Sequence, residues 1–224
     1  MRGMPRLSPS DPFAKATFAT VPLNGSRDSN DQGGGNVLLD GLESVADTLD
    51  DLSEGWATTY ADLSPESSVT PLGVSFLVTN LAYSWVGYEL LQASTVSGGG
   101  SGGGGAFLGG ITEAASAASF AYHYSQLEST GPKDLAVRLA LVVDYFFAWT
   151  AIVVALSFFV TTPDMSVPVE GLAACSISLV FFWLGTVYDS TRPYIVFHGL
   201  WHVLGAYGGY SVGLAHIDAL GQTI

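Results

Sequence analysis

Apolar segments of about 20 residues recur along the last two thirds of the chain, and they limit its fold more than any other feature. From residue 71 onward aliphatic and aromatic residues dominate, while charged residues are scarce. We expect five segments to cross a membrane as helices: 71–91, 106–126, 135–160, 167–188 and 194–214. Each is near the length that a helix needs to span a bilayer. The sequence therefore predicts an all-α, multi-pass membrane helix bundle over residues 70–215.

Two stretches of small residues qualify this prediction. The segment 106–126 is rich in Gly, Ala and Ser, which favours close packing against neighbouring helices over exposure to lipid. The stretch 97–105 consists of serine and glycine alone, and we interpret it as a natural flexible loop rather than an artificial linker. Cys175 is the only cysteine, so an intrachain disulfide cannot form.

Residues 1–69 have a different composition, with eleven of the twenty acidic residues and four of the seven basic ones. The first part, to about residue 35, is rich in Ser, Pro, Gly and Asp, so we expect disorder there. An apolar stripe in steps of three and four then predicts an amphipathic helix near residues 37–56. This helix either docks on its own chain or binds a protein partner. The acidic tail argues against nucleic acid as a partner, because nucleic acids attract basic patches.

Five polar side chains interrupt the apolar segments in an ordered pattern. His198 and His202 share one helix face, since residues four apart lie on the same side of a helix, and Ser119 and His123 do so too. Asp144 opens the most apolar part of the segment 135–160. The second segment ends, and the third and fifth begin, on the same side of the membrane. We therefore expect all five groups at similar depth near one membrane face, where ionisable residues indicate function.

Zinc-dependent hydrolysis is the chemistry that these side chains suggest. Three neutral imidazoles, from His123, His198 and His202, would leave one position of a tetrahedral zinc ion open for water, as in catalytic sites. Asp144 could accept a proton from that water or orient a histidine, and Ser119 could donate a hydrogen bond to an oxyanion. The alternatives are hydrogen bonds that only join helices and, less consistent with the serine and aspartate, haem ligation by two histidines.

The ordered set Ser119-x-x-x-His123, Asp144 and His198-x-x-x-His202 resembles the pattern of the CREST superfamily of membrane hydrolases. Short segments around these residues, and around Asn80, look most similar to the transmembrane protein 8 and myomaker group. The resemblance covers about residues 70–215.

This resemblance implies a seven-helix bundle that binds zinc through His123, His198 and His202, with Asp144 and Ser119 acting on water and on the substrate carbonyl. Some members hydrolyse amide or ester bonds of lipids, including ceramides and the acyl chains of GPI anchors, and others act in cell fusion or as receptors. The resemblance thus implies either a zinc-dependent lipid amidase or esterase or a non-catalytic scaffold, fusion or receptor-like protein. This chain offers five spans instead of seven, and the two absent ones would follow the Asp144 helix.

Charge and the family resemblance give opposite predictions of orientation. In the five-span arrangement every lysine and arginine lies on the N-terminal side of the membrane: Arg2, Arg6, Lys15, Arg27, Lys133, Arg138 and Arg192. The positive-inside rule then predicts a cytosolic N-terminus and site. The resemblance implies an N-terminus outside the cell or in a lumen, and we favour that orientation. Residues 216–224 would form a short C-terminal tail in which His216 is exposed.

Overall fold

The computed structural model describes residues 40–41, 43–45, 47–48, 68–96, 103–128, 135–187 and 191–221. Every regular element in these ranges is an α-helix, which confirms the predicted all-α class. The helices are α3 (Pro71–Thr79), α4 (Leu81–Val96), α5 (Gly103–Glu128), α6 (Leu135–Thr161), α7 (Val169–Val187) and α8 (Thr191–Gly221). The predicted disorder before residue 35, most of the amphipathic helix near 37–56 and most of the loop 97–105 lie outside the described residues.

Two helices, α6 and α7, are long and apolar enough to cross a membrane. The most apolar part of α6 is only 11% buried and that of α7 only 22%, whereas the core helix of a soluble protein is mostly buried. Both present large apolar side chains outward, among them Phe146, Trp149 and Trp183. Large exposed apolar surfaces of this kind are typical of helices that face lipid or a partner.

The five-span arrangement stays a prediction for the other helices. The predicted first span is divided into α3 and α4, which have 9 and 16 residues. Helices α5 and α8 are 26 and 31 residues long, but glycine, serine and histidine residues lower their hydropathy. Small and polar residues suit helices that pack inside a bundle, because they allow close approach and interhelical hydrogen bonds.

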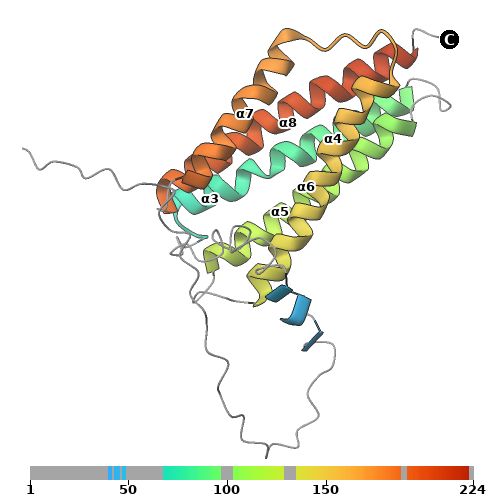
Figure 1. Ribbon diagram of the computed structural model, residues 1–224. Helices are drawn as coiled ribbons and strands as arrows, with labels where there is room; N and C mark the ends of the chain where they lie inside the picture. The colour runs from blue at the N-terminus through green and yellow to red at the C-terminus, as the bar shows by residue number, and fades with distance from the viewer. Residues whose placement is uncertain are drawn as a thin grey trace, which may run out of the picture. The chain divides into compact units, whose positions relative to one another are not determined.

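The helices pack side by side in an order that differs from the chain order (Figure 1). Helix α8 lies between α7 on one side and α3 and α4 on the other, and α5 lies between α4 and α6. Helices α6 and α7 follow each other in sequence, yet they make no packing contact within their described residues. The main apolar core joins α4, α5, α6 and α8 through Leu90, Leu108, Phe158 and Val212.

Asn80 interrupts the first apolar segment, so the prediction of one continuous helix over 71–91 was wrong. The Asn80 side-chain amide donates to the carbonyl oxygens of Phe76 and Leu77, at 3.3 and 3.1 Å. The Asn80 carbonyl oxygen accepts a bond of 2.8 Å from the Ser116 hydroxyl of α5. These bonds compete with the regular helix pattern between α3 and α4, and both helices contact α8.

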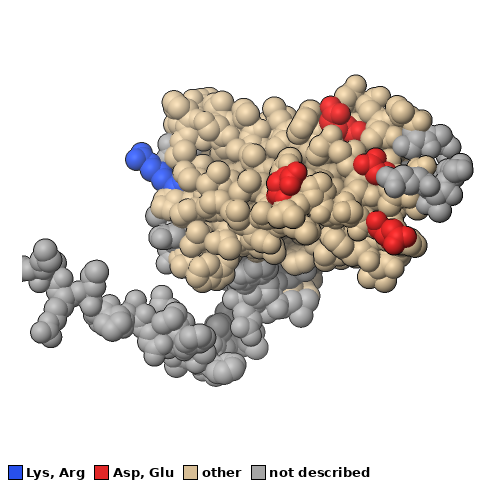
Figure 2. Space-filling model, turned by 90° about the horizontal axis from the view of Figure 1, so that it is seen from above, with Lys and Arg blue, Asp and Glu red and all other residues tan. Residues whose placement is uncertain are grey.

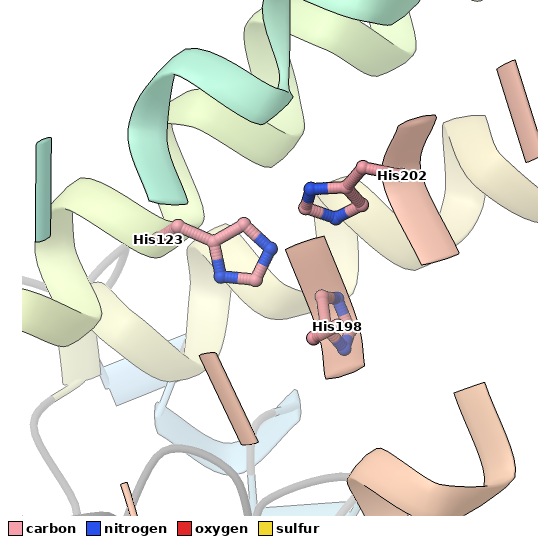
Figure 3. Close-up of side chains that lie close together, drawn as sticks. All are labelled: His123, His198 and His202. Carbon is pink, nitrogen blue, oxygen red and sulfur yellow. The ribbon is translucent and has the colours of Figure 1, made fainter. Parts of the chain in front are cut away.

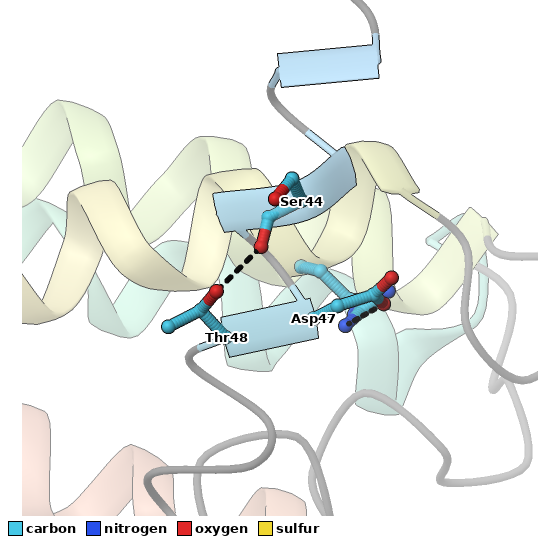
Figure 4. A network of polar contacts seen from close by, with 4 residues as sticks. Ser44, Asp47 and Thr48 are labelled. Atoms are coloured by element: carbon cyan, nitrogen blue, oxygen red, sulfur yellow. Dashed lines mark hydrogen bonds and ion pairs between the residues drawn. The ribbon is translucent and has the colours of Figure 1, made fainter.

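The described part of the predicted amphipathic helix contacts α6 (Figure 4). The Thr48 hydroxyl donates to the Ser44 carbonyl at 2.8 Å, as expected within a helical turn. The buried Arg138 guanidinium donates to the Asp47 carboxylate at 3.2 Å, and the Asp47 side chain is 68% exposed. This ion pair connects Asp47 to the start of α6.

Charged side chains differ between the two ends of the helices. Among the described residues from 68 onward, the basic ones are Arg138 near the start of α6 and Arg192 at the start of α8. Asp164, Glu170 and Asp218 lie where α6 ends, α7 begins and α8 ends. Figure 2 shows basic atoms at one end of the molecule and acidic atoms over its middle and opposite end.

His216 differs from its prediction. Helix α8 continues to Gly221, so His216 belongs to this helix instead of an exposed tail, and its side chain is only 6% exposed. Its ring stacks on Phe158 with centroids 3.7 Å apart, and its Nδ1 atom lies 2.6 Å from the Thr162 hydroxyl. Sequence patterns could not predict this packing, because it depends on how the end of α6 approaches the end of α8.

Candidate metal centre

Three histidines from two helices meet inside the bundle (Figure 3). His123 comes from the last two turns of α5, and His198 and His202 come from successive turns of α8. The three ring centroids are 4.7 to 5.0 Å apart. All three side chains are buried, with exposed fractions of 0%, 7% and 2%. The predicted convergence of these residues is confirmed, and the group could hold a metal ion.

The spacing of the nitrogen atoms fits a metal ion of ordinary size. One ligand atom from each ring lies within 4.8 Å of the other two. Because the corners of an equilateral triangle of that side are about 2.8 Å from its centre and zinc–imidazole bonds are about 2.0–2.1 Å, shifts below about 1 Å would suffice. The His123 Nε2 atom supports this fit, since it is buried and has no hydrogen-bond partner within the described part of the chain. A buried polar atom without a partner is costly unless it binds something such as an ion.

Thr79 of α3 holds the ring of His202. The Thr79 hydroxyl oxygen lies 2.9 Å from His202 Nδ1 and 2.6 Å from the Phe76 carbonyl oxygen. His202 Nε2 is thereby left as the ring atom that can bind a metal. Sequence reasoning missed Thr79, because one threonine in an apolar segment is a weak signal.

Gln126 of α5 holds the ring of His123. The Gln126 side-chain oxygen lies 3.2 Å from His123 Nδ1, one helical turn further along α5. This residue was also missed, although its position three residues after His123 places both on one helix face. Outer partners of this type commonly orient metal-binding histidines.

Aromatic side chains surround the three imidazoles. The Phe76 ring contacts all of them, with centroid distances of 4.4 Å to His123, 6.0 Å to His198 and 5.9 Å to His202. Tyr194 packs against His198 at 5.0 Å, and Tyr83 packs against His202 at 5.6 Å. This lining keeps water from much of the site and favours neutral imidazoles, the form that binds metals.

The two other predicted residues, Ser119 and Asp144, pair with each other. Their side chains are 4% and 7% exposed, and the Ser119 hydroxyl lies close enough to the Asp144 carboxyl group to interact with it. Ser119 precedes His123 by one helical turn, so the pair lies beside the histidine group. The Asp144 carboxylate does not belong to the group of histidine nitrogen atoms that lie within 4.8 Å of one another. The structure thus gathers the three histidines into one group and places a serine–aspartate pair next to it.

Comparison with known proteins adds no relative. No protein-family model, no curated protein and no solved structure matches this chain. The resemblance to the CREST superfamily therefore depends on the pattern of residues in the sequence.

Proposed function

We propose that this chain is an integral, multi-pass membrane protein that uses a zinc ion to hydrolyse amide or ester bonds of membrane lipids. The main support for the proposal is the buried cluster of His123, His198 and His202, whose side chains come from α5 and α8. Three imidazoles leave a fourth tetrahedral position for water or substrate, which distinguishes catalytic zinc sites from closed structural ones. The resemblance to the CREST pattern supports lipids of the ceramide or acylated GPI type as substrates.

The serine–aspartate pair would supply the remaining chemistry. When bound, zinc would polarise a lipid carbonyl and lower the pKa of water. The Asp144 carboxylate would accept the proton of the attacking water and return it to the leaving amine or alcohol. The Ser119 hydroxyl interacts with Asp144, and this interaction would keep the carboxylate in place until substrate enters. Ser119 would then turn to donate a hydrogen bond to the oxygen of the attacked carbonyl.

The surroundings of the site suit a lipid substrate. Phe76, Tyr194 and Tyr83 provide an apolar lining around the histidines. The outward faces of α6 and α7 are apolar, so a lipid could approach the bundle without leaving the bilayer. A polar substrate would gain little from such a lining, because its groups would lose water without finding partners.

Metal analysis of the detergent-purified protein tests the proposal. We expect about one zinc ion per chain in the wild type and in His216→Ala, and little or none in His198→Ala. His216 is a matched control, since it is a buried histidine of the same helix that lies outside the group. A folded wild-type protein without bound metal would contradict the proposal.

A second function, that of a non-catalytic scaffold or receptor-like protein, is favoured by one observation. The Asp144 carboxylate lies outside the set of close ligand atoms and interacts with Ser119 instead. The variant Asp144→Asn separates the two functions. A hydrolase would retain zinc but lose lipid turnover by a factor of about 100 or more. A scaffold would retain zinc, show no turnover in the wild type, and keep its cellular role in this variant.

A further inference from the structure

His123 and His202 have a hydrogen-bond partner at Nδ1, whereas His198 has none among the described residues. This difference affects which ring nitrogens can bind a metal ion before the ion arrives. We propose that Thr79 and Gln126 are positioning residues that fix the tautomers of His202 and His123. Both Nε2 lone pairs are then directed at the metal position before the ion binds. His198 completes the set as the ligand that can still reorient. This inference rests on the proposed metal site and names the groups that organise it.

The Thr79 contacts determine where the protons lie. A hydroxyl group has one hydrogen, and the Phe76 carbonyl oxygen, 2.6 Å away, can only accept. The Thr79 hydroxyl therefore donates to Phe76, and its lone pair faces His202 Nδ1 at 2.9 Å. That nitrogen must carry the hydrogen, because two facing lone pairs would repel each other. In a neutral imidazole, the hydrogen on Nδ1 leaves the lone pair on Nε2, which is the form that binds a metal through Nε2.

The Gln126 contact gives His123 the same tautomer. The Gln126 carbonyl oxygen accepts from His123 Nδ1 at 3.2 Å. The opposite nitrogen, Nε2, is buried and has no partner within the described residues. If Nε2 carried the hydrogen instead, a buried donor would remain unpaired, which is unfavourable. His123 therefore carries its hydrogen on Nδ1, where it donates to Gln126, and its lone pair on Nε2.

His198 is different, because its ring has aromatic contacts but no hydrogen-bond partner in the described part of the chain. Phe76, Tyr194 and Phe182 pack against it at centroid distances of 6.0, 5.0 and 6.3 Å. Such contacts restrict the position of the ring without selecting which nitrogen carries the hydrogen. The site thus combines two pre-oriented ligands with one adaptable ligand.

The role of Thr79 can be distinguished from that of an ordinary helix threonine by comparison with Thr150. Thr150 of α6 donates to the carbonyl four residues earlier at 2.6 Å, much as Thr79 donates to the Phe76 carbonyl three residues earlier. Thr150 lacks a histidine neighbour among the residues described. Replacing either threonine by valine removes a hydroxyl of the same kind, but only Thr79→Val removes an acceptor from a histidine. Thr79→Ser keeps the acceptor and should restore the wild-type behaviour.

The test measures zinc affinity by competition with a chelator, in Thr79→Val, Thr79→Ser, Gln126→Leu and Thr150→Val beside the wild type. We expect zinc binding to weaken by about 10- to 100-fold in Thr79→Val and Gln126→Leu, as is usual for outer partners of metal-bound histidines. Thr79→Ser and Thr150→Val should stay within about 3-fold of the wild type. Equal affinities in Thr79→Val and Thr150→Val would overturn the assignment of Thr79.

A second measurement needs no metal. Nitrogen NMR of histidine-labelled, metal-free protein at about pH 8, where ordinary imidazoles are neutral, reports which ring nitrogen carries the hydrogen. We expect hydrogen on Nδ1 of His123 and His202 in the wild type, and a mixture for His202 alone in Thr79→Val. An unchanged His202 tautomer in that variant would refute the inference. A wild type that binds no zinc but shows these tautomers would refute the proposed function and leave the positioning roles intact.

Discussion

Replacing Gly109 by alanine would test the closest approach between α4 and α5. A Cβ atom added at Gly109 would lie 2.9 Å from the Gly87 carbonyl oxygen and 3.1 Å from the Leu91 backbone nitrogen. Both neighbours are backbone atoms, so neither can move away by changing a rotamer. Gly110 is the next residue on the same helix, and a Cβ atom there would meet nothing within 4 Å. Gly110→Ala is therefore a control with the same chemical change and none of the contact.

The expected cost follows from these distances. Ordinary van der Waals contact begins at 3.4 Å, so α4 and α5 would have to separate by about 0.5 Å at this point. Overpacking of this size costs about 1–3 kcal/mol. Both variants gain the same helix propensity, about 1 kcal/mol for alanine over glycine. This gain cancels in the comparison, and Gly109→Ala should be less stable than Gly110→Ala by about 1–3 kcal/mol.

Unfolding in mixed detergent micelles, followed by loss of helical circular dichroism, would measure this difference. His123 lies 14 residues beyond Gly109 on α5, about 21 Å along the helix axis. We therefore expect the folded fraction of Gly109→Ala to bind metal as the wild type does. Equal stability of the two variants would show that α4 and α5 do not pack as closely as described, and the predicted packing role of the small residues in 106–126 would lose its support.

Three other outcomes can be measured in the same way. Gly208→Ala should lower the free energy of unfolding by about 1–3 kcal/mol relative to Gly209→Ala, because its Cβ atom would lie 3.1 Å from the Cys175 backbone nitrogen of α7, whereas Gly209 has open space; equal values would contradict the α7–α8 contact. Free zinc at 100 times its dissociation constant should raise the free energy of unfolding by about 2.7 kcal/mol, and a chelator should remove this gain. In His198→Ala, the chelator should leave the free energy of unfolding unchanged. Asp47→Asn should change the free energy of unfolding by less than about 1 kcal/mol, since the Asp47 side chain is 68% exposed and asparagine keeps an acceptor oxygen for the buried Arg138; a larger loss would show that the buried Arg138 depends on the charge of Asp47.

The histidine group was predictable because it follows from two simple rules. Residues four apart share a helix face, which places His198 and His202 together on one helix. Successive segments of the predicted five-span arrangement alternate in direction, which brings the end of one segment beside the start of another. Together these rules place His123 near the other two, and the structure confirms that the three residues meet. Neither rule depends on the details of side-chain packing.

The partners of the histidines were not predictable, because they depend on the position of α3. Neither Phe76 nor Thr79 belongs to a motif, and their role arises from where α3 lies beside α8. The boundary between α3 and α4 at Asn80 was not predicted either, because apolar residues flank it on both sides. His216 was misjudged for the same reason, since its burial depends on contacts with α6. Sequence periodicity describes single helices, whereas these features arise between helices.

Gly199, which follows His198 in the motif, connects the local pattern to this packing. A Cβ atom at Gly199 would lie 3.2 Å from Thr79 Cγ2, closer than ordinary contact, so a larger residue would push α3 away from α8. The Thr79–His202 bond of 2.9 Å would then lengthen by a few tenths of an ångström, to the limit of useful hydrogen-bond geometry. Gly199 is therefore constrained as the two histidines are. The histidine spacing supplies the ligands, and the small residue beside them allows α3 to approach closely enough to orient one of them.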